Sequence, residues 1–333
     1  MTGRTRYFVV GSSFVLVVGL CTGLVAYYSS SLPIRSSTLG PPELSYVPST
    51  TSALAFANVR EIMDSEFHQK LRTVQAPGDG TNTFAAETGV DIERDVDSVL
   101  VAFGGDSHPL AFVRGRLDPA VLEARAAEHG GRATDYRGKK VFVLTGIPAD
   151  GTPAPGTSGV TTMALLEPGL LVLGTESGVK GAVDAALAHA DVTANADLMK
   201  LVGDVQNDGN AWLVGDVQSL SGRAKDVADE VQQHVPGLHR FAVSAQVDRA
   251  VRAKVRAQTT DQKSADDLRE MVNGLVAAGH MMSSTNPQVS TLLDSVRATG
   301  SGDTVEVSLT VPPELLDHLG DASKLLQQAP GAR

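Results

Sequence analysis

A run of 22 uncharged residues near the N-terminus, Tyr7–Tyr28, constrains this chain more than any other feature of its sequence. At about 1.5 Å per residue, a helix of this length crosses a hydrocarbon layer of about 30 Å. Arg4 and Arg6 precede the run and the next charge is Arg35, so the positive-inside rule places the N-terminus in the cytoplasm. We therefore expect residues 1–6 to be cytoplasmic and residues 7–28 to form a single-pass transmembrane helix.

The alternative for the same run is a signal peptide that is cleaved after export. Such a peptide has a shorter apolar region, of about 7 to 15 residues, and ends in a small-x-small site, which Ser29 and Ser31 would supply. Leu20 before Cys21 argues against a lipoprotein signal, which requires a small residue there. Residues 29–42 are rich in Ser and Pro and are expected to link the anchor to the body of the protein.

The charge balance limits the partners of the body. The net charge is −10, and residues 1–42 contain Arg4, Arg6 and Arg35 but no acid. The remainder therefore carries 25 basic and 38 acidic side chains, a balance of −13. Nucleic-acid binding requires clustered cations, so we expect no nucleic-acid partner. Cys21 is the only cysteine, which excludes disulfides and thiolate metal sites from the body.

The apolar pattern of the body suggests an internal duplication. Ala53–Val59 reads as a strand that leads into a helical pattern over Arg60–Val74, and Ala211–Val217 begins a similar unit 158 residues later. Each half then continues with two strands, a helix and a strand. These elements are Val96–Phe103, Leu110–Leu117, a helix from Pro119 and Lys139–Thr145 in the first half, and Phe241–Val247, Val251–Thr259, a helix near Ser264 and Thr304–Val311 in the second.

This order, β-α-β-β-α-β, is that of the ferredoxin-like split βαβ motif. We therefore predict an α+β body made of two tandem repeats with largely antiparallel sheets, residues 43–190 and 191–333. The first repeat adds a hairpin, Thr161–Leu166 with Leu170–Gly174, and a helix containing Val179 and Val183. The second adds a helix that begins at Asn286 and Pro287.

Two stretches of the first half carry a resemblance to known proteins. They are ELSYVPSTTSALAFANVREIMDSEFHQKLR and ETGVDIERDVDSVLVAFGG. Over about residues 43–190 the chain resembles a group of uncharacterised exported bacterial proteins, known only as a domain of unknown function. The resemblance implies a location in the cell envelope and no activity, and it brings no functional residues.

One string has the form of a catalytic motif. Ser177-Gly178-Val179-Lys180 matches the Ser-x-x-Lys of serine acyl-transferases, and Ser284-Thr285-Asn286 is similar to their second motif. The third element of the set, Lys-Thr-Gly, does not occur in the sequence. Thr175 to Ser177 also follow a strand and open a helix, where hydroxyl groups usually cap the helix. We therefore expect these residues to be structural, and expect no enzyme.

Two groups of oxygen-bearing side chains could attract a divalent cation. They are Asp91, Glu93, Asp95 and Asp97, and Asp204, Asn207, Asp208 and Asn210. Neither has the spacing of a known calcium loop. His234 and His239 are separated by Pro236 and Gly237, which break the helix that would align them as zinc ligands. Gly78-Asp79-Gly80 and Gly104-Gly105 lack the spacing of phosphate-binding loops. We expect no metal or cofactor.

The segment Val251–Thr259 has the clearest strand pattern in the chain. Val and Ala alternate with Arg252, Lys254, Arg256 and Gln258, so three cations share one face of the strand. Either neighbouring strands supply acids to this stripe or the stripe stays free for an anionic partner. The first interpretation is a solvated strand, and the second is a docking site for an acidic envelope protein or for anionic lipid head groups.

Together these features predict a membrane-anchored extracytoplasmic protein that binds or scaffolds partners in the cell envelope. Two alternatives remain: an envelope enzyme whose site is assembled from distant residues, and a small-ligand carrier with an apolar cavity between the two repeats. The sequence does not determine the oligomeric state or the identity of a ligand.

Overall fold

The computed structural model describes residues 39–74, 90–104, 108–128, 131–145, 160–220, 235, 237–282 and 287–313, which build one continuous antiparallel sheet of twelve strands. The spatial order is β11-β12-β10-β9-β8-β1-β2-β3-β7-β6-β5-β4. The strands are β1 (Thr51–Asn58), β2 (Val96–Gly104), β3 (Leu110–Gly115), β4 (Arg132–Tyr136), β5 (Lys139–Thr145), β6 (Val160–Glu167), β7 (Leu170–Gly174), β8 (Ala211–Asp216), β9 (Leu238–Val247), β10 (Val251–Thr259), β11 (Arg297–Thr299) and β12 (Thr304–Val311).

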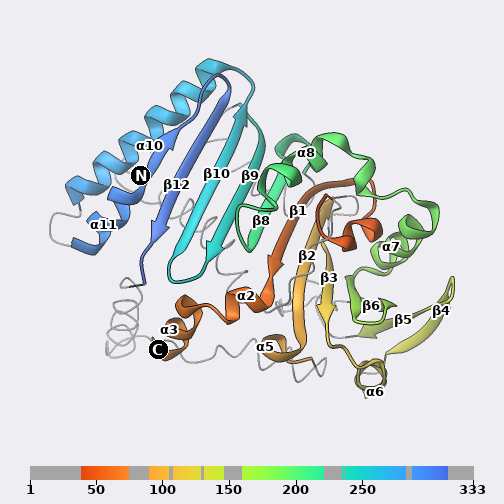
Figure 1. Ribbon diagram of the computed structural model, residues 1–333. Coiled ribbons are helices and arrows are strands. Elements are labelled where there is room, and N and C mark those ends of the chain that lie inside the picture. Colours follow the sequence, from red (N-terminus) through yellow and green to blue (C-terminus); the bar gives the residue numbers. More distant parts are fainter. Residues whose placement is uncertain are drawn as a thin grey trace, which may run out of the picture.

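Helices cover parts of both faces of the sheet (Figure 1). The α-helices are α2 (Val59–Met63), α3 (Glu66–Val74), α5 (Ile92–Asp95), α6 (Pro119–Glu128), α7 (Glu176–Ala188), α8 (Ala196–Val205), α10 (Gln262–Met282) and α11 (Pro287–Ser295). Three short 3₁₀ helices are η1 (Pro42–Tyr46), η2 (Val192–Ala194) and η3 (Val217–Ser219). The alternation of side chains along each strand supplies apolar residues to both faces, which explains why helices pack on each.

The two faces have separate cores. On one face, which we call the α7–α8 face, Leu54, Leu100 and Phe112 pack with residues of η1, α7 and α8. On the other, the α6–α10 face, one cluster lies beneath α2, α3 and α6. A further cluster joins Ala257 and Val305 to α10. The core therefore runs the length of the sheet instead of forming two independent bodies.

The centre of the sheet relates its two halves. Ala55 of β1 faces Leu213 of β8, which stands 158 residues later, and Ala53 faces Gly215, the residue 158 positions after Ala57. Ala57 in turn faces Ala211, the residue 158 positions after Ala53. The two pairs are therefore related by a local twofold axis through the Ala55–Leu213 pair. Outward from it, β2, β3 and β7 follow on one side, and β9, β10 and β12 follow on the other.

The prediction of two tandem ferredoxin-like repeats is wrong. Each neighbouring pair of the sheet is antiparallel, and in each half the first three strands are neighbours in chain order. A split βαβ motif would instead place parallel strands side by side, joined by a crossover. The apolar pattern reveals the order of elements along the chain but not which strands pair. Two antiparallel neighbours can be joined by a connection of almost any length. The same element order therefore fits a meander.

Two local predictions also differ from the structure. The helical pattern Arg60–Val74 is divided into α2 and α3 because the Ser65 hydroxyl donates to the Ile62 carbonyl and accepts from the His68 backbone N–H. The expected cap Ser264 lies inside α10, and the carboxylate that receives its backbone N–H at 2.8 Å belongs to Asp261. In both cases a local side-chain bond to the backbone decides where a helix begins.

Within the described residues, no helix is both long and apolar enough to span a membrane. The expected transmembrane helix at residues 7–28 lies outside the described residues, as does the helical pattern expected after Leu220.

Candidate functional site

The basic stripe of β10 lies on the α7–α8 face, beside α8. Lys254 Nζ is 3.3 Å from Asp208 Oδ2, and Arg256 lies 3.4 Å from Asp204 and 3.2 Å from Glu306 of the neighbouring β12. Two of the three cations are therefore paired with acids of the same chain. Arg252 is exposed, and its side chain makes no hydrogen bond or ion pair with the described residues.

A third pair on the same face extends this arrangement. Arg240 of β9 donates to Asp197, in the first turn of α8, at 2.8 Å. Asp197 and Asp204 stand seven residues apart, two helical turns, so one edge of α8 presents its acids to the sheet. These pairs align α8 with β9 and β10. Docking of an acidic partner on the stripe stays a prediction, and such a partner would compete with Asp204 and Asp208.

The residues that begin α8 form a helix start signal in the sequence. Asn195 caps the helix by accepting the Leu198 N–H at 3.1 Å. Leu198, Val202 and Val205 then follow at helical spacing and are buried. This cap and period would have predicted a helix with an acidic edge.

The Ser-x-x-Lys string forms the first turn of α7 and has a structural role. Thr175 caps the helix by accepting the Gly178 N–H at 3.1 Å. Lys180 donates to Glu176 at 2.6 Å, and this hydrogen bond raises the pKa of Lys180. A lysine that acts as a general base needs a lowered pKa, so the pair opposes that role. Ser284, Thr285 and Asn286 lie outside the described residues.

The acidic candidates are engaged with the backbone or with cations. Asp91 caps α5, Asp95 pairs with Arg94 at 2.9 Å, and Asp97 pairs with Arg60 at 2.9 Å. The hydrogen bond from Arg94 lowers the pKa of Asp95. In the part of the chain that the structure describes, no group of three or more His, Cys, Asp and Glu side chains could hold a metal ion.

The other described sequence candidates contact the backbone or a neighbouring side chain. Asn210 is buried and joins the end of β9 through the Val247 N–H and carbonyl. His239 Nδ1 lies 3.9 Å from Asp216. Gly104 has φ +150°, and a Cβ there would lie 2.6 Å from the Thr50 carbonyl oxygen, so glycine serves a close backbone approach. Residues 78–80, Gly105, His234 and Pro236 lie outside the described residues.

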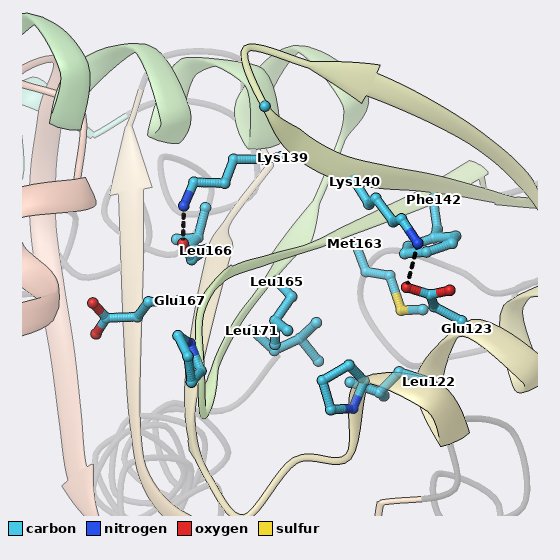
Figure 2. Close-up of a pocket in the computed structure, with 13 residues that line it drawn as sticks. Leu122, Glu123, Lys139, Lys140, Phe142, Met163, Leu165, Leu166, Glu167 and Leu171 are labelled. Carbon is cyan, nitrogen blue, oxygen red and sulfur yellow. Dashed lines mark hydrogen bonds and ion pairs between the residues drawn. The ribbon is translucent and has the colours of Figure 1, made fainter.

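A concave site that sequence reasoning missed opens beneath α6, on the α6–α10 face (Figure 2). We call it the α6 cleft. Its volume is about 300 Å³, and it lies between the start of α6, strand β5 and the β6–β7 hairpin. It is lined by Pro119, Leu122, Glu123, Gly138, Lys139, Lys140, Phe142, Met163, Leu165, Leu166, Glu167, Pro168 and Leu171.

Local capping fixes where α6 begins beside the cleft. Asp118 accepts the Ala120 N–H at 2.8 Å, so α6 begins at Pro119 and its apolar side, with Leu122 and Ala126, faces the sheet. Leu122, Met163 and Leu171 are nearly buried and form part of the apolar floor.

Charged side chains occupy the rim of the α6 cleft. Lys140 of β5 donates to Glu123 of α6 at 2.9 Å, and this pair bridges the two elements (Figure 2). Lys139 Nζ donates to the Leu166 carbonyl, and no described carboxylate lies within 4 Å of it. Lys139 pairs with Tyr136 and stands two residues before Val141, and both pack on the α7–α8 face, so the Lys139 side chain leaves β5 on the face opposite the floor of the cleft. No side chain of the lining carries a hydroxyl, thiol or imidazole.

Glu167, at the edge of the cleft, belongs to a partly buried ionic cluster on the α7–α8 face. Arg114 of β3 binds both Glu43 of η1 and Glu167, the latter at 2.9 Å. Burial by itself would lower the pKa of Arg114, but the hydrogen bonds and charges of Glu43 and Glu167 outweigh it and raise the pKa. Burial and the charge of Glu167 also raise the pKa of Tyr46. This cluster fastens η1 to the sheet.

A second cleft, of about 310 Å³, is polar. It lies where β1, α8 and η3 meet and is lined by Ser49, Thr50, Thr51, Ser52, Asn195, Asp197, Leu198, Leu201, Asp216, Ser219 and Arg240. Its charged groups already have partners, because Asp216 caps η3 and Asp197 binds Arg240. The α6 cleft is therefore the better candidate for a ligand.

Comparisons with known proteins add little. No protein-family model matches the chain, and no curated protein matches it. Among solved structures, the chain is similar to TP0453 in its crystal form I, with a TM-score of 0.47 and 9% sequence identity over 85% of this chain and 98% of that one. A likeness this distant carries no argument about the fold or the function.

Proposed function

We propose that the chain is an extracytoplasmic binding protein of the cell envelope, held at the membrane by residues 7–28. The location rests on the uncharged run Tyr7–Tyr28, with its preceding arginines Arg4 and Arg6. In this proposal the linker 29–42 leads to the sheet, and Glu43 at the start of η1 fastens the chain to Arg114.

The α6 cleft is the observation that carries the binding role. It is preformed, because a capped helix and two strands border it, and its floor is apolar with few charged groups at the rim, as is typical of small-molecule sites. The cleft lies within β5–β7 and not between the two halves of the sheet, so it is not the apolar cavity between repeats that the small-ligand-carrier alternative expects. The proposal is therefore a ligand-binding module, with the sheet as its rigid support.

The lining of the α6 cleft favours binding over catalysis. A hydrolase or transferase that works through a covalent intermediate needs a nucleophile next to a base. The ionisable groups of the lining instead contact one another, a backbone carbonyl or Arg114.

A C-terminal reporter tests the location. We expect an enzyme that is active only outside the cytoplasm to be active when it is fused after Arg333. The same reporter fused after Arg6, ahead of the apolar run, is the matched control and should be inactive. Activity only of a reporter that requires the cytoplasm would contradict the proposal.

A further inference from the structure

The polar cleft where β1, α8 and η3 meet contains a hydroxyl group that the fold does not use. A β-bulge interrupts the pairing of β1 with β2 between Thr51 and Ala53, so Ser52 is an extra residue. Thr51 therefore pairs with Gly104, one position beyond the Ala53–Phe103 pair, and its side chain lies on the α7–α8 face. Thr51 lines the cleft and is 6% exposed, and its hydroxyl has no hydrogen-bond partner among the described residues.

Strands β8 and β9 bring a carboxylate and a guanidinium to the same cleft. Asp216 accepts the Gln218 and Ser219 N–H groups through Oδ1, and its Oδ2 makes no hydrogen bond with the described residues. Arg240 donates to Asp197 through Nη2 at 2.8 Å, which leaves Nη1 without a hydrogen bond in the described part of the chain. Arg240 Nε and Asp216 Oδ2 are 3.7 Å apart, so the two groups lie side by side without a hydrogen bond between them. The cleft thus has an unused donor beside an unused acceptor.

Leucine side chains of α8 supply the apolar part of the lining. They are Leu198, which is buried, and Leu201, which is partly buried. A ligand in this cleft therefore meets polar groups from β1, η3 and β9 and aliphatic surface from α8. The volume of about 310 Å³ is at the low end of ligand sites, which favours one small ring over a longer molecule.

The charges of the lining disfavour an ionic ligand. Asp197, Asp216 and Arg240 are the charged side chains of the described lining, so an anion would meet two carboxylates. A cation would compete with Arg240 for Asp197 and with backbone N–H groups for Asp216. An uncharged hydroxyl group avoids both costs, because it donates one hydrogen bond and accepts two.

From this combination we infer that the polar cleft binds an uncharged polyhydroxylated ring, such as a hexose. Its hydroxyl groups bond to Thr51, Asp216 and Arg240, and its C–H groups pack on Leu201. No described residue of the lining is aromatic, so we expect a dissociation constant of about 1 mM. The site lies on the face of the sheet opposite the α6 cleft, so the inference goes beyond the function proposed above and does not depend on it.

Saturation-transfer difference NMR of the full chain in neutral-lipid nanodiscs tests this inference. The probes are glucose, galactose and mannose, each compared with its uronate and its amino derivative. We expect saturation transfer to at least one hexose, and weaker transfer to the two charged derivatives of that hexose.

Removal of the unused hydroxyl is the first variant. Because this hydroxyl has no described partner, Thr51→Val should change the melting temperature little, but it should weaken binding of the hexose about fivefold by removing one hydrogen bond. Thr310→Val is the matched control. The Thr310 hydroxyl also makes no hydrogen bond with the described residues, and β12 is separated from β1 by three strands, so binding should not change.

Filling the cleft provides the second arm. Ser219 is exposed at the rim, so Ser219→Trp adds bulk without disturbing the core and should weaken binding about tenfold. Leu187→Trp, at an exposed site on α7 outside the lining, is the matched control and should bind like the original chain.

No transfer to any of the three hexoses would overturn the inference. Binding that is unchanged in Thr51→Val or in Ser219→Trp would also overturn it, as would stronger transfer to a charged derivative than to its hexose. An inactive C-terminal reporter would instead overturn the membrane location and leave the polar cleft untouched.

Discussion

The buried pair of Glu43 and Arg114 permits a test in which two mutations together do less harm than one. The Glu43 side chain is 2% exposed and that of Arg114 is 28% exposed, and Arg114 also contacts Glu167, which is 41% exposed. In Arg114→Met, the Glu43 carboxylate keeps its buried position but loses its cation. Removing one partner of a buried pair costs about 3–5 kcal/mol of unfolding free energy.

The double variant Glu43→Met/Arg114→Met removes both buried charges. Glu167 then remains at a position where water solvates it. Replacing a buried ion pair by apolar side chains is often close to neutral, so we expect the double variant to lose less than about 2 kcal/mol and to be more stable than Arg114→Met alone. Arg125→Met is the control, because it breaks an exposed pair with Glu128 and should cost less than about 1 kcal/mol.

Urea unfolding at neutral pH measures these differences. Trp212 is the only tryptophan, is buried on β8 and stacks on Phe56 with ring centroids 5.5 Å apart, so its fluorescence reports on the centre of the sheet. If the losses of the single variants Glu43→Met and Arg114→Met simply add in the double variant, the pair is not coupled. That result would refute the reasoning that a buried, paired charge holds η1 on the sheet.

Three further predictions concern the core, one histidine and the edge of α8. Leu54→Ala should lower the free energy of unfolding by about 2–5 kcal/mol because Leu54 is fully buried on β1, whereas Leu187→Ala at an exposed site should change it little; urea unfolding compares them. Burial lowers the pKa of His68, so its stabilising effect is complete above the unfolded-state pKa of about 6.5 and is lost as the pH falls through the lower folded-state pKa. His68→Gln should flatten the fall in melting temperature below pH 6.5, and an unchanged pH profile would count against this account. Asp204→Asn and Asp208→Asn break exposed pairs and should each cost less than about 1 kcal/mol by urea unfolding, so a larger loss would show that the α8 contacts are stronger than surface pairs.

The position of strands could be predicted from the sequence, but their neighbours could not. The alternation in Val251–Thr259 predicts β10 with its ends at the same residues, and the hairpin of β6 and β7 follows from the turn at Pro168 and Gly169. Which strand lies beside which depends on long-range pairing, for which apolar periodicity contains no information. The 158-residue relation between Ala55 and Leu213 was visible in the sequence, but only the register shows that these residues face each other.

Strand β4 shows a different limit. Arg132–Tyr136 is polar and mostly exposed, and it forms the edge of the sheet by pairing with β5. This edge strand has little apolar pattern, because most of its side chains face solvent and not a core. Sequence periodicity therefore finds β5 and misses its neighbour.

For the candidate sites too, the sequence predicts local patterns but not long-range contacts. Alternation correctly placed Arg252, Lys254 and Arg256 on one face, but the acids that contact two of them, Asp208 just after α8 and Asp204 in it, come from 46 and 52 residues earlier in the chain. The α6 cleft is assembled from a helix, a strand and a hairpin whose lining residues run from Pro119 to Leu171. Its residues resemble ordinary core positions in the sequence, so only packing reveals the space between them.

Labelling of a single cysteine in intact cells tests the central claim, an extracytoplasmic body held by residues 7–28, most directly. Cys21 is the only cysteine, so Cys21→Ser with Leu187→Cys leaves one thiol, at an exposed site on α7. Cys21→Ser with Thr5→Cys is the control, with its thiol before the apolar run. A maleimide that does not cross the cytoplasmic membrane should label the first variant in intact cells and the second only after lysis. Labelling of the first variant only after lysis would contradict the account.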